Sequence, residues 1–153
     1  MVGVGDKAPD VAFEGPDGSM TTLAAWEGKP LVLYFYPKDD TSGCTREAQD
    51  FTALADEFAA AGVTLLGVSK DTAKKHKAFT DKYSLRVPLG TDADGKLLEA
   101  FGAWVEKSMY GRKYMGIDRS TFLIDRDGRI ARAWRKVKVP GHAADVLAAA
   151  KEL

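Results

Sequence analysis

The chain alternates between short apolar runs and longer stretches in which apolar residues recur every three or four positions. The apolar runs lie at Leu31–Tyr36, Thr64–Ser69 and Ser120–Asp125, and turn-forming residues bound each of them. Runs that are apolar on both faces are typical of central strands covered by helices on both sides. We therefore predict three buried strands.

Turn-forming residues predict two hairpins in addition. The Asp-Gly pair at 127–128 predicts a strand over Ile130–Arg135 that runs antiparallel to the strand before it. Near the N-terminus, a Pro-Asp-Gly turn at 16–18 separates Val11–Phe13 from Met20–Thr22 and predicts a small hairpin.

Helical periodicity fills the segments between the strands. Ala48, Phe51 and Phe58 belong to an apolar set with the spacing of one helix face, and Gly62 is placed to end that helix. The complete pattern predicts an α/β sandwich, a mixed central sheet with helices on both faces, in a single domain over 1–153. The predicted helices are Thr45–Ala61, Thr72–Tyr83, Lys96–Phe101 and Gly141–Leu153.

Composition and charge narrow the function classes. Hydrophobic residues make up 45% and charged residues 29%, a balance typical of soluble globular domains. Lysine plus arginine and aspartate plus glutamate both total 22, so we expect neither nucleic acid nor a membrane as partner. No stretch approaches the roughly 20 apolar residues of a membrane span, and the first ten residues do not resemble a signal peptide. We expect a cytoplasmic protein.

The chain has one cysteine, Cys44, which excludes a disulfide framework and favours a reducing compartment. The two histidines, His76 and His142, lie far apart and belong to no cluster with metal-ligand spacing. We interpret each as a surface or helix-cap histidine, and we expect no metal and no cofactor.

Cys44 lies where the first apolar strand gives way to the first long helix. Active sites of open α/β sheets tend to lie outside the carboxyl ends of strands. A thiolate at a helix N-terminus is stabilised by the helix dipole and by free backbone N–H groups, which lowers a cysteine pKa. Thr41 can reach the sulfur or its substrate with its hydroxyl. The position alone leaves open whether Cys44 is reactive or simply a buried cysteine.

The sequence resembles the peroxiredoxins. Pro37, Thr41 and Cys44 fill the Pro-xxx-Thr/Ser-xx-Cys signature of that family. The strings YFYPKDDTSGCTREAQDF and GIDRSTFLIDRDGRI resemble the bacterioferritin-comigratory-protein branch, also called peroxiredoxin Q. The likeness extends from GDKAPDVAF near the N-terminus to PGHAADVL at the last helix, so it covers nearly the whole chain.

The resemblance implies a thioredoxin-like fold and a thiol-dependent reduction of hydrogen peroxide and organic hydroperoxides. Cys44 would be the nucleophile, and Arg119 matches the active-site arginine of the family. Thr41 and the Cys44 backbone N–H would hold the peroxide oxygens, and Pro37 would shield the sulfenic acid. Glu47, one turn into the helix, would orient Arg119. By the same resemblance, we expect a monomer.

The sequence departs from the family where a second cysteine would stand. Gln49 occupies the position of a resolving cysteine in many members, and Ala78–Asp81 contains none of the alternative cysteines. The resemblance then implies a one-cysteine enzyme, recycled by thioredoxin, glutaredoxin or a low-molecular-weight thiol. Ser42 also stands where this branch usually has proline, a change that loosens the loop without removing a catalytic group.

Two other functions compete with a peroxide scavenger. A binding or chaperone module on the same scaffold would need none of Pro37, Thr41 and Arg119, so we disfavour it. A redox sensor, in which oxidised Cys44 signals to a partner, fits the sequence equally well. The aromatic segment Phe101–Met115 either lines a pocket for bulky hydroperoxides or is a surface loop that packs its aromatic residues on the core. We favour the loop.

Overall fold

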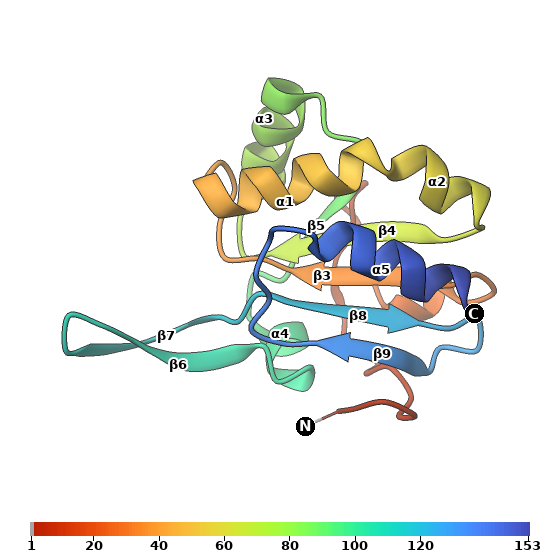
Figure 1. Cartoon of the computed structure of the whole chain (residues 1–153). Helices are drawn as coiled ribbons and strands as arrows, with labels where there is room; N and C mark the ends of the chain where they lie inside the picture. Colours follow the sequence, from red (N-terminus) through yellow and green to blue (C-terminus); the bar gives the residue numbers. More distant parts are fainter. Residues whose placement is uncertain (1) are drawn as a thin grey trace.

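A computed structural model of the protein describes residues 2–153 and contains one large sheet with helices on both faces (Figure 1). The sheet has seven strands in the order β2-β1-β5-β4-β3-β8-β9. Its strands are β1 (Phe13–Glu14), β2 (Met20–Thr21), β3 (Leu31–Phe35), β4 (Thr64–Ser69), β5 (Leu89–Thr91), β8 (Ser120–Ile124) and β9 (Ile130–Trp134).

Strand directions follow the connections between the strands. β3, β4 and β5 are parallel neighbours, β8 is antiparallel to β3, and β9 is antiparallel to β8. The predicted strands and the hairpin between β8 and β9 are therefore confirmed. The N-terminal hairpin of β1 and β2 is confirmed too, and it joins the sheet through β5, a strand that we did not predict.

The side chains of β3 alternate between two cores, one on each face of the sheet. Val32 and Tyr34 pack on one face with α1, α2, α3 and α5, whereas Leu33 and Phe35 pack on the other with η1 and α4. Among residues 2–153, no helix is long and apolar enough to cross a membrane. The helices are η1 (Leu23–Trp26), α1 (Ser42–Ala53), α2 (Ala55–Ala60), α3 (Ala73–Tyr83), α4 (Lys96–Ala100) and α5 (His142–Lys151).

The predicted helix Thr45–Ala61 was wrong at its start and in its continuity. Helix α1 begins at Ser42 because Thr41 is extended and serves as the N-cap residue. The helix is interrupted at Leu54, which has φ −101° and ψ 5° and separates α1 from α2. The apolar periodicity continues through Leu54, so the sequence pattern does not reveal this break.

The prediction of a loop over Phe101–Met115 was also wrong. Strands β6 (Trp104–Met109) and β7 (Arg112–Ile117) form an antiparallel hairpin that projects from the body of the protein (Figure 1). Tyr110 and Gly111 both have positive φ, 53° and 78°, as a two-residue hairpin turn requires. Tyr110 is 98% exposed, and the side chains of Met109, Tyr114 and Met115 are exposed as well, so these residues do not pack on the core.

The surface interpretation of the two histidines was wrong. His76 is 5% exposed and lies on the inward face of α3, one turn before the buried Phe79. His142 is 6% exposed and begins α5, where its Nε2 lies 2.8 Å from the Thr121 hydroxyl. Both rings are buried because the apolar face of their helix covers the sheet at that point.

Candidate active site

Cys44 is the third residue of α1 and lies at the carboxyl end of β3. Its side chain is 2% exposed and packs in the same core as Ala48 and Phe51, which follow it on the inward face of the helix. The N–H groups of the first helical turn have no acceptors within the helix, so they surround the thiol with partial positive charge. This is the environment that stabilises a thiolate.

Arg119 reaches the sulfur from the connection between β7 and β8. Its Nη2 lies 3.4 Å from Cys44 Sγ, although the two residues are 75 positions apart in the chain. A Cβ atom added at Gly43 would lie only 3.1 Å from Arg119 Nη2, so glycine at this position lets the guanidinium lie against the first turn of α1. The structure thus brings together the two residues that we singled out from distant motifs.

Glu47 holds the other end of the same guanidinium. Arg119 Nη1 donates to Glu47 Oε1 at 2.6 Å, and the Glu47 side chain is only 1% exposed. Among the described residues, Glu47 Oε2 has no hydrogen-bond partner. Burial raises the pKa of Glu47 to about 7, against the lowering effect of Arg119. The pKa of Arg119 is raised: burial lowers it, but the negative charges of Glu47 and Cys44 and their hydrogen bonds outweigh that. The expected pairing of Glu47 with Arg119 is present.

Thr41 and Pro37 are exposed residues of the loop between β3 and α1. The Thr41 hydroxyl donates to the Lys38 carbonyl at 2.8 Å and so closes the loop on itself, rather than reaching Cys44. Pro37 is exposed at the start of this loop. Both residues therefore lie at the surface, in the loop that leads to Cys44.

Tyr34 is a residue of this region that we did not single out from the sequence. Its ring stacks on Phe51 with centroids 4.8 Å apart, and among residues 2–153 its buried hydroxyl has no hydrogen-bond partner. Burial raises its pKa well above the usual value, and the negative charges of Glu47 and Cys44 raise it further. Tyr34 is thus a neutral phenol close to the thiol and its acidic neighbour. A tyrosine in an otherwise apolar buried strand was the available signal.

The positions at which relatives carry a second thiol are occupied by other residues. Gln49 is exposed on α1, whereas Cys44 faces inward, and Ala78 is exposed on α3. Cys44 is the free cysteine of the chain, and no group of three or more possible metal ligands occurs in the part of the chain that the structure describes. The chemistry at this site therefore depends on one sulfur.

Comparison with known proteins gives a consistent result. The model of the AhpC/TSA family matches residues 4–133. Peroxiredoxin Bcp of Bacillus subtilis is 47% identical over 150 residues, which cover 98% of this chain and 96% of that protein. Peroxiredoxin Bcp of Xanthomonas campestris is 53% identical over 147 residues, which cover 94% and 92%.

Solved structures agree with the sequence relatives. The bacterioferritin comigratory protein of X. campestris, studied for its alkyl peroxide reduction activity, has a TM-score of 0.90 at 47% identity, covering 98% of each chain. A cysteine-to-serine mutant of Xylella fastidiosa PrxQ has a TM-score of 0.92 at 40% identity, covering 99% and 97%. The predicted thioredoxin-like fold is thereby confirmed. The chain belongs to the AhpC/TSA family, among its peroxiredoxins of the Bcp and PrxQ type, and is a thiol-dependent peroxidase.

Proposed function

We propose that this protein reduces hydrogen peroxide and alkyl hydroperoxides at Cys44. The observation that carries the proposal is the position of Arg119, with Nη2 3.4 Å from the sulfur and Nη1 held by Glu47. A cation fixed beside a thiol stabilises the thiolate, which is the reactive form. A second support is the location of the thiol in the first turn of α1.

In the first step, the Cys44 thiolate attacks one oxygen of the peroxide. The sulfur–oxygen bond forms as the oxygen–oxygen bond breaks, and the second oxygen leaves as hydroxide or alkoxide and takes up a proton from solvent. Negative charge therefore grows on the leaving oxygen, and donors already aimed at it lower the barrier. We assign this task to Arg119 and to the backbone N–H of Cys44, while the Thr41 hydroxyl oxygen, whose proton is donated to the Lys38 carbonyl, accepts a hydrogen bond from the peroxide.

Recycling of the sulfenic acid uses thiols from other molecules. A first thiol attacks the Cys44 sulfenic acid, forms a mixed disulfide and releases water. A second thiol then displaces Cys44 and regenerates the reduced enzyme. Thioredoxin, glutaredoxin and low-molecular-weight thiols all supply this chemistry, and a cytoplasmic location would supply them in reduced form. Pro37, at the border of the site, would limit the access of water and further peroxide to the intermediate.

A peroxide-consumption assay across a panel of thiol donors tests the proposal, with Cys44→Ser as the central variant. We expect Cys44→Ser to fold, with an unchanged circular dichroism spectrum, and to lose turnover because a hydroxyl does not replace the thiolate. Intact mass spectrometry after one equivalent of peroxide should show one added oxygen, which a sulfenic-acid trap captures. Full turnover by Cys44→Ser, or oxidation that adds no oxygen, links no chains and consumes no thiol, would refute the role of Cys44.

We also propose that the enzyme acts as a monomer. Its site is assembled from α1 and the connection between β7 and β8 of the same chain, so no second copy is needed to complete it. Light scattering of the reduced protein should give the mass of one chain, 16.6 kDa. A stable reduced dimer or decamer would contradict this proposal and leave the role of Cys44 unaffected.

A further inference from the structure

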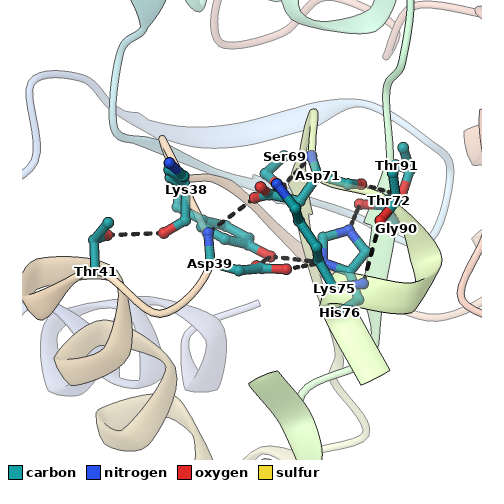
Figure 2. A network of polar contacts seen from close by, with 11 residues as sticks. Lys38, Asp39, Thr41, Ser69, Asp71, Thr72, Lys75, His76, Gly90 and Thr91 are labelled. Carbon is teal, nitrogen blue, oxygen red and sulfur yellow. Dashed lines mark hydrogen bonds and ion pairs between the residues drawn. The ribbon is translucent and has the colours of Figure 1, made fainter. Parts of the chain in front are cut away.

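A second buried polar cluster consists of Tyr36, Asp39 and His76. It joins the loop that precedes α1 to α3 and to the Gly90 carbonyl of β5 (Figure 2). The side chains of His76 and Asp39 are 6% and 5% exposed, and His76 Nδ1 lies 2.6 Å from Asp39 Oδ2. The Tyr36 hydroxyl donates to Asp39 Oδ1 at 2.6 Å.

The hydrogen bonds determine how many protons the cluster contains. A backbone carbonyl only accepts, so His76 Nε2, 2.9 Å from the Gly90 oxygen, must carry a proton. The short contact on the other side of the ring needs one more proton, on either His76 Nδ1 or Asp39. The cluster is thus a closed, buried pair with every polar atom of His76 and Asp39 bonded.

This cluster fixes the backbone of the active-site loop. The Asp39 backbone N–H donates to Asp71 Oδ2 at 2.8 Å, so Asp39 is held by its main chain as well as by its side chain. The Ser69 hydroxyl at the end of β4 donates to the same Asp71 oxygen at 2.7 Å. Figure 2 shows Asp39 bonded to Asp71 through its main chain and to His76 through its side chain, with Lys38 and Thr41 on the adjoining turn of the loop.

Asp39 lies in the chain between Pro37 and Thr41, two exposed residues of the loop that leads to Cys44. The loop closes across Asp39 through the hydrogen bond from the Thr41 hydroxyl to the Lys38 carbonyl. Thr41 is also the N-cap residue of α1, and its carbonyl accepts the first helical hydrogen bond, from the Thr45 N–H at 2.8 Å. A displacement of Asp39 therefore moves the Thr41 hydroxyl and the first turn of α1 together.

We propose that His76 is a positioning residue for peroxide reduction, acting through Asp39. Its bond to Asp39 holds the loop from Pro37 to Thr41 so that the Thr41 hydroxyl and the first-turn N–H groups are aligned for the peroxide oxygens. The proposal rests on the function assigned to Cys44. His76 itself touches neither the substrate nor the sulfur, so it affects the reaction only through the loop.

The test is a double-mutant cycle on kcat/KM for an alkyl hydroperoxide, with His76→Phe, Asp39→Ala and the combined variant. We expect each single substitution to lower kcat/KM roughly 10- to 100-fold, because small misplacements of reacting groups are costly. The combined variant should lose no more kcat/KM than His76→Phe alone. His76→Phe leaves the buried Asp39 carboxylate without its partner, and the added Asp39→Ala removes that carboxylate. Strictly additive losses would overturn the proposal.

Two controls separate positioning from general destabilisation. Phe79→Leu perturbs the same buried face of α3 but removes none of the hydrogen bonds of Asp39, and it should keep kcat/KM within about threefold. His76→Gln, which retains a donor toward Asp39, should recover most of the activity. If His76→Phe does not fold, a cycle with His76→Leu replaces it. Equal losses in Phe79→Leu and His76→Phe would overturn the proposal.

A final readout is the rate of Cys44 alkylation by iodoacetamide at high pH, where the sulfur is fully ionised in both proteins. Alkylation does not use the groups that bind the peroxide oxygens, so this rate should be the same in His76→Phe and in the parent. A fall in the alkylation rate as large as the fall in kcat/KM would mean that His76 acts on the sulfur itself instead of the alignment of the loop, and would overturn the proposal. Full peroxidase activity in every His76 variant would also overturn it, while inactive Cys44→Ser would leave the proposed function intact.

Discussion

Two buried carboxylates lie close to Cys44 in the chain, Glu47 paired with Arg119 and Asp39 paired with His76, and they are bonded differently. Glu47 gives one oxygen to Arg119 and keeps the other without a partner among residues 2–153. Asp39 uses both oxygens, one toward His76 and one toward Tyr36. We call the Glu47–Arg119 pair open, because one carboxylate oxygen has no partner among the described residues, and the Asp39–His76 pair closed, because both carboxylate oxygens are bonded.

The difference follows from what each pair faces. The Arg119 side chain is 17% exposed and lies against the sulfur, so its cation is available to a substrate that approaches from solvent. The rings and carboxylate of the Asp39 pair are enclosed between the loop and α3, where no substrate would reach them. The carboxylate with an unbonded oxygen, Glu47, thus holds the arginine beside the reactive sulfur. The fully bonded carboxylate, Asp39, instead holds the loop in one conformation.

Arg119→Lys should produce the largest effect at the open pair. A lysine retains the charge but cannot bond Glu47 and the sulfur at once with a planar fork, so kcat/KM for peroxide should fall about 100-fold. Stopped-flow measurement of peroxide reduction gives this rate directly. Arg86→Lys is the matched control, since Arg86 pairs with the exposed Asp56 at the surface. A rate for Arg119→Lys equal to that of the parent would remove Arg119 from the mechanism.

Glu47→Gln should change how stability depends on pH. Because burial raises the folded-state pKa of Glu47 to about 7, above its value of 4.5 in the unfolded chain, the folded protein binds more protons between these values. The contribution of Glu47 to the free energy of unfolding is therefore fully present below pH 4.5 and is lost as the pH rises through 7. Relative to the parent, Glu47→Gln should gain about 2 kcal/mol between pH 5 and pH 8. Urea unfolding at both pH values measures this gain, and Glu57→Gln, on the exposed face of α2, should show none.

Asp40→Asn should have the smallest effect and thereby sharpen the contrast with Asp39. Asp40 also ties the loop to α3, through Lys82 Nζ at 2.9 Å and the Tyr83 hydroxyl at 2.7 Å. These contacts are exposed, and exposed ion pairs contribute only about 0 to 1 kcal/mol. We expect kcat/KM within about twofold of the parent. A loss as large as that of Asp39→Ala would show that the loop depends on its surface contacts.

Much of the fold could be predicted because its signals are local. Buried strands such as Leu31–Phe35 consist almost entirely of apolar residues, and the Asp-Gly turn before β9 identifies a hairpin directly. Strand β5 was missed because three residues containing a glycine carry almost no periodic signal. The interruption at Leu54 was missed because hydrophobic spacing does not report a backbone change that keeps the same face inward.

The site could be predicted only where a motif marked it. Cys44 stands in a recognisable signature, and Arg119 stands in a second matching segment, so both were identified before their contact was seen. The bond between Asp39 and His76 joins residues 37 positions apart, and neither side chain differs in kind from an exposed one. Asp39 and His76 meet only because α3 packs on the loop, and a local sequence pattern carries no information about that packing.

Because Cys44 is buried, we expect the rate of recycling to depend on the fraction of molecules in which the sulfur is accessible. Its side chain is 2% exposed, so we expect a thiol carried on another protein to reach the oxidised sulfur only in molecules whose first α1 turn has opened. The observed rate is the open fraction multiplied by the rate in open molecules. Each loosening of that turn by about 1.4 kcal/mol therefore speeds recycling tenfold, with no change in the sulfur chemistry, until the open form predominates.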